Sequence, residues 1–184
     1  DFQMKEGNSK KFKGEIGIGS LSAKGFIEGP IKKDTTTFFL SARRSILDLF
    51  TRPFTAIASS GQAVSGYTFY DINGKLTHRF KNNGKLEFVS YFGRDKIFIN
   101  SGYQDETNNF RYKFKNQIKW GNIMGQLKYT RPLTSKSFFS ISGGVTRFNY
   151  NTDISARQET LSSGDELSES SVNFISGVFD ALIK

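Results

Sequence analysis

Side chains capable of chemistry are few and scattered along the chain. The 184 residues include one histidine, His78, and no cysteine, which leaves no thiolate nucleophile, no disulfide and too few soft ligands for a zinc site. No nucleophile, base and acid occur in an arrangement that predicts catalysis. His78 shares the apolar face of its predicted strand near a short turn, so we interpret it as an interfacial polar residue. The sequence predicts no enzyme, no cofactor and no bound metal.

Two other patterns resemble ligand-binding motifs, but the residues around them do not fit nucleotide or nucleic-acid binding. The glycines of GEIGIGS (14–20) are not followed by the helix that a nucleotide-binding loop needs. Lys113 and Lys115 belong to a basic run beside aromatic residues, a pattern found in nucleic-acid-binding proteins. Alternation places these cations and aromatics on opposite faces, so bases could not stack beside bound phosphates. We therefore expect no nucleic-acid partner, and the net charge of +9 suits an anionic membrane surface instead.

The elements that must carry these residues are strands. No apolar run approaches the roughly 18 residues of a transmembrane helix, and the dominant period is two, which predicts β-structure. The predicted strands are 11–19, 23–31, 35–48, 66–80, 85–99, 110–131, 137–154 and 170–183. We expect an all-β fold in which about eight antiparallel strands form an up-and-down meander.

The predicted connections differ in length. Tight turns are expected at 29–36, 81–85 and 131–137, and long loops at about 47–66, 97–110 and 153–171. Asn83 and Gly84 are the strongest turn signal, because both tolerate the positive φ of tight hairpins. Alternation of short turns with long loops is typical of outer-membrane β-barrels, which have short periplasmic turns and long extracellular loops. A transmembrane barrel is therefore favoured over a soluble sandwich.

Each predicted strand has an apolar and a polar face. The candidates for a polar lumen wall are Arg43, Asp71, Asn73, Lys75, Arg79, Lys113 and Lys115. The candidates for a lipid-facing surface or aromatic girdle are Tyr70, Ile72, Leu76, Phe88, Phe114 and Trp120. The apolar phase slips by one residue at Gly121-Asn122, where we expect a β-bulge. The apolar faces mix large aromatics with glycine and alanine, which suits lipid better than a core of matched volumes.

Several segments resemble the start of the barrel in TonB-dependent outer-membrane receptors of the Bacteroidetes type. They are GEIGIGSLSAKGFIEGPI (14–31), DTTTFFLSARRSILDLF (34–50), YTFYDINGKLTHRF (67–80) and NNGKLEFVSYFGRDK (82–96). The most specific part is EGPI (28–31) followed by SARR (41–44) and by Leu47-Asp48. The resemblance implies that residues 1–10 end a plug domain or link it to the barrel. Residues 11–184 would then supply the first strands of a 22-stranded pore.

The resemblance implies active import of a nutrient across the bacterial outer membrane. The implied partners are outer-membrane lipid, a plug domain and the TonB complex, a small-molecule or oligomeric nutrient and, as a further candidate, a surface lipoprotein. No plug precedes Asp1, and the chain ends in FDALIK without a terminal aromatic, so we expect a part of a larger receptor. Two alternatives stay open: a self-contained eight-stranded barrel with a structural or adhesive role, and a soluble basic β-domain that binds polyanions.

Overall fold

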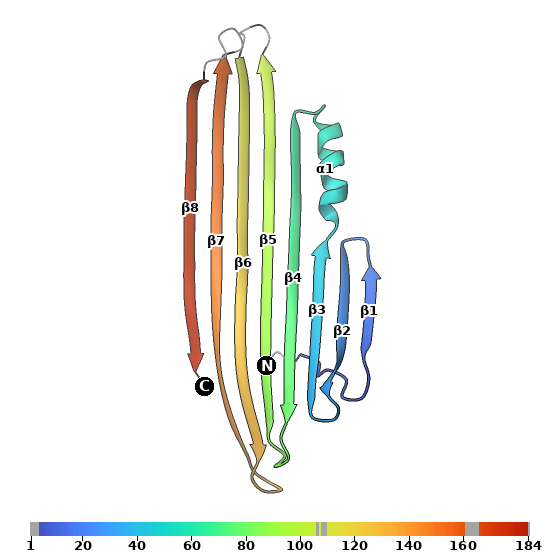
Figure 1. Ribbon diagram of the computed structural model, residues 1–184. Coiled ribbons are helices and arrows are strands. Elements are labelled where there is room, and N and C mark those ends of the chain that lie inside the picture. The colour runs from blue at the N-terminus through green and yellow to red at the C-terminus, as the bar shows by residue number, and fades with distance from the viewer. Residues whose placement is uncertain (1–3, 106, 108–109, 161–165, 184) are drawn as a thin grey trace.

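Alternating residues form long strands in this chain, and a computed structural model assembles them into one antiparallel sheet with a single helix (Figure 1). The structure describes residues 4–105, 107, 110–160 and 166–183, and side chains only as far as residue 158. The strands are β1 (Lys13–Ile18), β2 (Ser22–Lys32), β3 (Thr36–Ser45), β4 (Ala63–Arg79), β5 (Lys85–Asp105), β6 (Phe110–Pro132), β7 (Phe138–Thr160) and β8 (Glu166–Ile183), and the helix is α1 (Leu47–Ala58).

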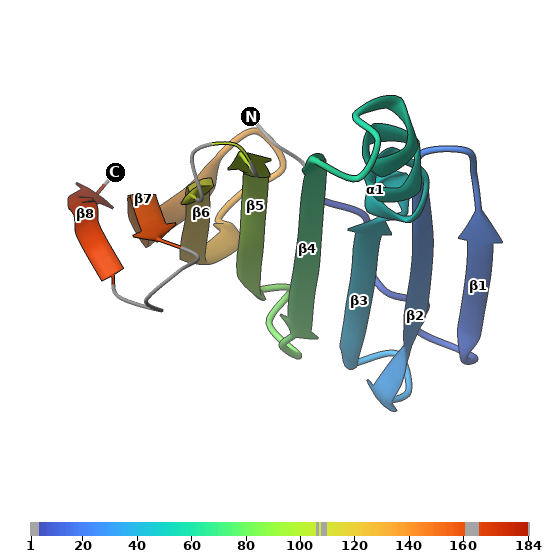
Figure 2. The same ribbon diagram turned by 90° about the horizontal axis from the view of Figure 1, so that it is seen from above.

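Each strand pairs with the next one in sequence, in the order β1 to β8. The expected antiparallel up-and-down arrangement is therefore confirmed. Seen from above, β1 and β8 lie at opposite edges of the row of strands (Figure 2), and no pairing joins them among the described residues. Closure into a barrel stays a prediction.

The tight turns form where they were expected. Asp34 and Asn83 adopt the left-handed conformation, with φ of 57° and 59°. Asn and Asp tolerate positive φ better than other non-glycine residues, which explains their use in the β2–β3 and β4–β5 turns. Gly84 adds a close approach, because a Cβ there would lie 2.7 Å from the hydroxyl oxygen of Tyr129.

The expected long loops are largely wrong. β5 continues through Asp105 and β7 continues through Thr160, so most of 97–110 and much of 153–171 is strand. Residues 161–165 of the last expected loop lie outside the described residues. These segments are polar on one side but still alternate, and pairing with neighbouring strands satisfies their backbone groups.

The third expected loop, 47–66, contains α1. Its apolar residues recur at helical spacing: Leu49, Phe50, Phe54 and Ile57. Asp48 lies in the first turn, where a carboxylate is favoured by the helix dipole. Its Oδ2 is 3.9 Å from the Nε of Arg52 one turn later. The helical spacing was a signal that the period-two reading overlooked.

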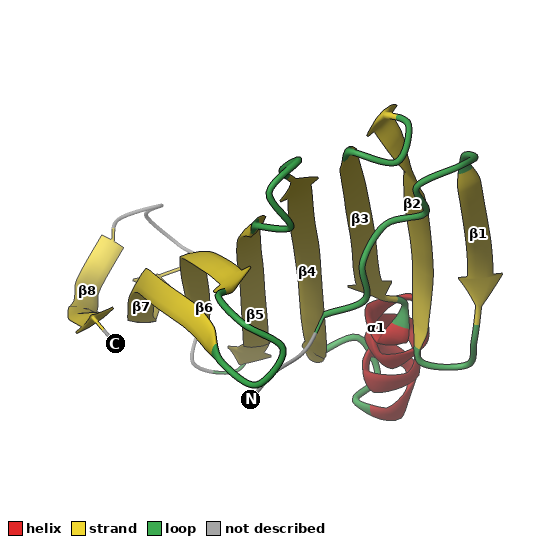
Figure 3. Cartoon of the chain, turned by 90° about the horizontal axis from the view of Figure 1, so that it is seen from below, coloured by secondary structure: helices red, strands yellow, loops and turns green. Residues whose placement is uncertain are grey.

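The two sides of the sheet can be followed from strand to strand, because directly paired residues point to the same side. We call the side on which α1 packs the helix side; Phe98 lies there, with the guanidinium of Arg52 4.8 Å from its ring centroid. We call the other side the arm side. The N-terminal arm, residues 4–12, crosses β4, β3 and β2 on that side before entering β1 (Figure 3).

Candidate functional site

The helix side carries a band of exposed apolar side chains near the tight turns. Its members occupy paired positions on β2 to β7: Ile27, Leu40, Tyr70, Ile72, Leu76, Phe88, Ile123, Leu127, Ile141 and Val145. Each exposes about two-fifths or more of its surface. On β5 and β6 the band covers residues 86–92 and 123–129, somewhat less than the roughly 9–11 residues with which a strand crosses a bilayer.

The arm side opposite this band is polar and well covered. Arg43 pairs with Asp71 at 2.7 Å, and the Asn73 amide donates to the same carboxylate at 3.3 Å. Lys75 is 8% exposed and pairs with Glu87 at 2.9 Å. Among the described side chains, the buried polar residues outnumber the buried apolar ones, of which Phe98 is the only example. In this part of the sheet, the covered side is therefore polar and the exposed side is apolar.

The N-terminal arm docks on this polar surface through charges. The Lys75 ammonium donates to the backbone oxygen of Met4 at 2.9 Å. Glu6 accepts from Arg79 at 2.5 Å and from Lys85 at 2.9 Å. Partial burial by itself would raise the pKa of Glu6, but the hydrogen bonds and positive charges of Lys85 and Arg79 outweigh it and lower that pKa. Gly7 passes so close to β3 that a Cβ there would lie 2.1 Å from the carbonyl oxygen of Phe38.

The bulge expected at Gly121-Asn122 does not form. The pairing of β6 with both neighbours runs through this point without a register shift. Gly121 instead permits close approach, because a Cβ there would lie 2.7 Å from the carbonyl oxygen of Gly93. Without a bulge, the apolar residues before and after Gly121 lie on opposite sides of the sheet.

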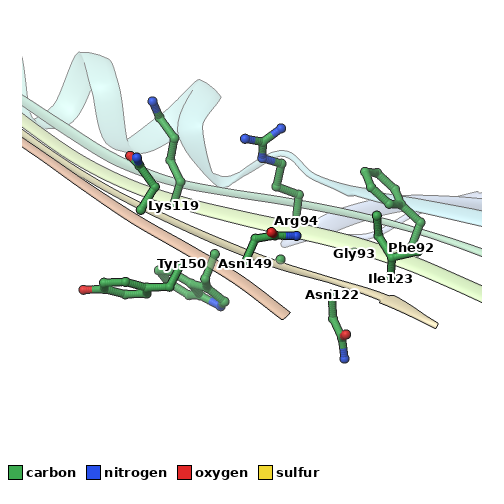
Figure 4. A pocket seen from close by; sticks show the side chains of 11 residues that line it. Phe92, Gly93, Arg94, Lys119, Asn122, Ile123, Asn149 and Tyr150 are labelled. Atoms are coloured by element: carbon green, nitrogen blue, oxygen red, sulfur yellow. The ribbon is translucent and has the colours of Figure 1, made fainter. Parts of the chain in front are cut away.

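The two sides therefore exchange polarity at one row of paired residues, which we call the crossover row. It contains Arg94, Gly121 and Asn149. Figure 4 shows the consequence: the side chains of Lys119, Arg94 and Phe92 extend to one side of the strands, and Asn122 extends to the other. On the helix side, Phe92 marks the end of the apolar band, and the charged residues Arg94 and Lys119 lie beyond it.

An aromatic wall occupies the arm side beyond the crossover row. Tyr67 stacks on Trp120, with ring centroids 6.3 Å apart, and its hydroxyl donates to the Asp95 carboxylate at 2.5 Å. The Arg43 guanidinium lies over the ring of Phe69, 4.9 Å from its centroid. Other aromatic residues at paired positions on this side are Tyr103, Tyr112, Phe114 and Tyr150.

A hollow of about 300 Å³ opens where the polar surface meets the aromatic wall. Its lining combines the rings of Tyr67 and Tyr91 with the charged groups of Arg43, Asp71 and Asp95. Aromatic faces beside paired charges can bind a ligand that has both flat apolar surface and polar groups. This hollow is the best candidate for a ligand contact in the part of the chain that the structure describes.

Strand pairing shows on which side of the sheet each predicted lumen-facing or lipid-facing residue lies, and for four of them this differs from the grouping expected from the sequence. Arg43, Asp71, Asn73, Lys75 and Arg79 share the arm side, and Tyr70, Ile72, Leu76 and Phe88 share the helix side. Lys113 and Lys115 were grouped with the first set, but they lie on the helix side. Phe114 and Trp120 were grouped with the second set, but they lie on the arm side. The absent bulge accounts for all four corrections.

His78 lies near the β4–β5 turn, where its ring contacts two neighbouring side chains. Its Nδ1 lies 2.8 Å from the hydroxyl of Thr36, and its ring meets the edge of Phe80. Among the described residues, no group of three or more His, Cys, Asp or Glu side chains is placed to hold a metal ion. The described helix is too short and too polar to span a membrane.

No family of known proteins, curated protein or solved structure matches this chain.

Proposed function

We propose that this chain forms part of the wall of a TonB-dependent outer-membrane receptor that imports a nutrient. The apolar band on the helix side carries the proposal. A band of exposed apolar residues that crosses six strands needs an apolar partner, and lipid accepts the uneven profile of these side chains. In the proposal, the helix side faces lipid and the arm side faces the lumen.

The polarity of the arm side supports this orientation. Asp71 and Lys75 are buried and paired opposite the exposed Ile72 and Leu76, which reverses the arrangement in a soluble sheet packed on a core. A soluble polyanion-binding domain would leave the apolar band in water. The band is therefore better explained by a transmembrane wall than by that alternative.

The N-terminal arm supports the receptor rather than a small empty barrel. It enters the sheet from the arm side and is held there by Glu6, Met4 and their basic partners. A plug domain joined to residue 1 would then lie within the lumen, next to the strands that it must fill. The segments that resemble TonB-dependent receptors begin directly after this arm.

In the proposal, the length of the strands favours ligand entry at one end. β5, β6 and β7 continue well beyond the crossover row, so their upper parts would stand outside the bilayer. There the helix side is charged, as a surface in water should be, and the aromatic wall faces the lumen. Nutrient entering from outside would meet Tyr67, Trp120 and the hollow beside Asp95 before it reached the plug.

The proposal can be tested by uptake. Cells that express the receptor would be offered one labelled siderophore, one vitamin, one glycan and one peptide, with and without a protonophore. We expect energy-dependent uptake of one class, reduced in a Tyr67→Ala, Trp120→Ala variant but not in a Lys128→Ala control. Purification as a folded protein without detergent would exclude a membrane wall of any kind.

A further inference from the structure

The helix α1 presents its polar residues to the sheet and its apolar residues to the surroundings. Thr51 lies against Gly66, and the hydroxyl of Thr55 accepts from the backbone N–H of Ser65 at 3.0 Å. Asp48 is 7% exposed. Phe54 and Ile57 are 72% and 81% exposed on the opposite face. A helix on a water-exposed surface has the reverse polarity.

This inverted helix lies at the edge of the apolar band. It packs on the helix side beside β4, near the crossover row, with Arg52 over Phe98. Asp48 and Arg52 of its polar face line a groove together with Tyr70 and Ile72, so the helix lies just beyond this end of the band. Amphipathic helices of this kind, with bulky apolar residues on one face, lie in the interfacial layer of membranes.

A groove of about 700 Å³ lies between the first turns of α1 and the strands β1 to β5. On the helix side, the end of the groove nearer the band is apolar and the end nearer α1 is basic. The apolar residues are Ala42, Tyr70 and Ile72, and the basic residues are Arg44, Arg52 and Lys96. The lining contains two carboxylates, Asp48 and Asp71, against five basic residues; Arg52 lies 3.9 Å from Asp48 and Arg43 lies 2.7 Å from Asp71. The groove therefore has an excess of positive charge at one end and an apolar floor at the other.

Arg44, Arg52 and Lys96 are arranged to hold an anion at the basic end. Arg44 is exposed, and within the described part of the chain neither Arg44 nor Lys96 forms an ion pair. Arg52 and Lys96 both lie over the ring of Phe98, with distances of 4.8 Å and 5.4 Å to its centroid. The shared ring therefore keeps the two cations near each other.

We propose that this groove binds an anionic membrane lipid, with its headgroup phosphate on Arg44, Arg52 and Lys96 and its acyl chains along the apolar band. This inference rests on the proposed transmembrane function and goes beyond it by assigning a lipid class to one site. Charge complementarity selects a phosphate headgroup, and the apolar floor that continues into the band selects a lipid over a free phosphate. The exposed face of α1 then lies in the interfacial layer above the apolar band.

The test compares two triple variants of the full chain, extracted in detergent and placed in nanodiscs. Arg44→Gln, Arg52→Gln, Lys96→Gln removes the basic end of the groove. Lys11→Gln, Lys33→Gln, Lys136→Gln removes the same charge at exposed positions elsewhere. Each protein is titrated with phosphatidylglycerol, phosphatidylcholine or inorganic phosphate, and bound lipid is counted by native mass spectrometry.

A single basic residue near an anionic surface strengthens binding about fivefold, so we expect the groove variant to lose phosphatidylglycerol affinity on the order of 100-fold. The control variant should retain binding, and phosphatidylcholine should bind weakly to all three proteins. Equal affinity in both variants, or tight binding of inorganic phosphate alone, would overturn the lipid site. A wild-type protein that stays folded without detergent would instead refute the transmembrane proposal on which the site depends.

Discussion

The indole of Trp120 stacks on the ring of Tyr67 across the intervening strand, with ring centroids 6.3 Å apart. This contact puts Trp120 on the same side of the sheet as Asp71, opposite Ile72 and Leu76. A lipid-facing surface that continued along β6 without change would have required Trp120 on the other side. The stack therefore places the aromatic wall on the arm side, whereas the apolar band lies on the helix side. The change from one to the other occurs at the crossover row.

A matched pair of substitutions on β6 tests which side meets lipid. Leu127 belongs to the apolar band, and Gln126 is its exposed neighbour on the arm side. We expect Leu127→Arg to impair membrane assembly, because a lipid-facing arginine at mid-bilayer costs about 2–4 kcal/mol, whereas lumen positions tolerate charge. Gln126→Arg should assemble normally in an outer-membrane fractionation assay. Equal assembly of the two variants would contradict the assignment of sides.

Gly121 should tolerate no side chain, for reasons of space alone. A Cβ there meets the carbonyl oxygen of Gly93 at 2.7 Å, and backbone atoms cannot rotate away. We expect Gly121→Ala to destabilise the sheet by about 1–3 kcal/mol, as overpacking does elsewhere. Gly143→Ala is the control, because nothing lies within 4 Å of its added methyl group. Thermal unfolding in detergent measures both, and an unchanged midpoint for Gly121→Ala would refute the close approach.

Docking of the N-terminal arm should depend on pH through Glu6. Its pKa in the folded chain is lower than the ordinary value of 4.5, so docking is stabilised fully above about pH 4.5. That stabilisation is lost as the pH falls through the lowered pKa. The effect should be small, because partly exposed ion pairs contribute about 1 kcal/mol or less each.

The chain has no cysteine, so a spin label on Ser9→Cys reports the mobility of the arm alone. We expect a mobile signal to grow below about pH 4.5 in the wild type. Glu6→Gln should show it at pH 7, since it removes both ion pairs. Glu15→Gln, an exposed residue of β1, should behave as the wild type. A mobility that does not change with pH would mean that contacts other than those of Glu6, such as the ion pair of Lys5 with Glu28, hold the arm.

The sequence predicted the strands and turns because these depend on local patterns. Alternation located the antiparallel strands, and Asn83 marked a turn through its tolerance of positive φ. Alternation also placed Asp71 and Lys75 on one side of the sheet and Ile72 and Leu76 on the other, because all four residues lie within one uninterrupted strand. Closure into a barrel depends on contacts beyond the described sheet, and neither alternation nor this register decides it.

The errors came from features that alternation cannot resolve. At Gly121 the alternation of apolar and polar residues shifts by one position. A β-bulge would produce this shift, and so would an exchange of polarity between the two sides of an unbulged sheet. Only the pairing of β6 with β5 and β7 distinguishes them. The helix α1 was missed because its polar face packs on the sheet, and Pro53 within it reads as a loop residue.

The exchange of polarity at the crossover row is the central claim, and spin labels along β6 test it most directly. Single cysteines at positions 115 to 127 would be labelled in bilayers and probed with oxygen, which concentrates in lipid, and with a water-soluble nickel chelate. We predict that labels at 123, 125 and 127 are oxygen-accessible, whereas labels at 115, 117 and 119 on the same side are nickel-accessible. High oxygen accessibility at 114, 118 and 120 together with 123, 125 and 127 would contradict the account, because it would mean one lipid-facing surface joined by a bulge.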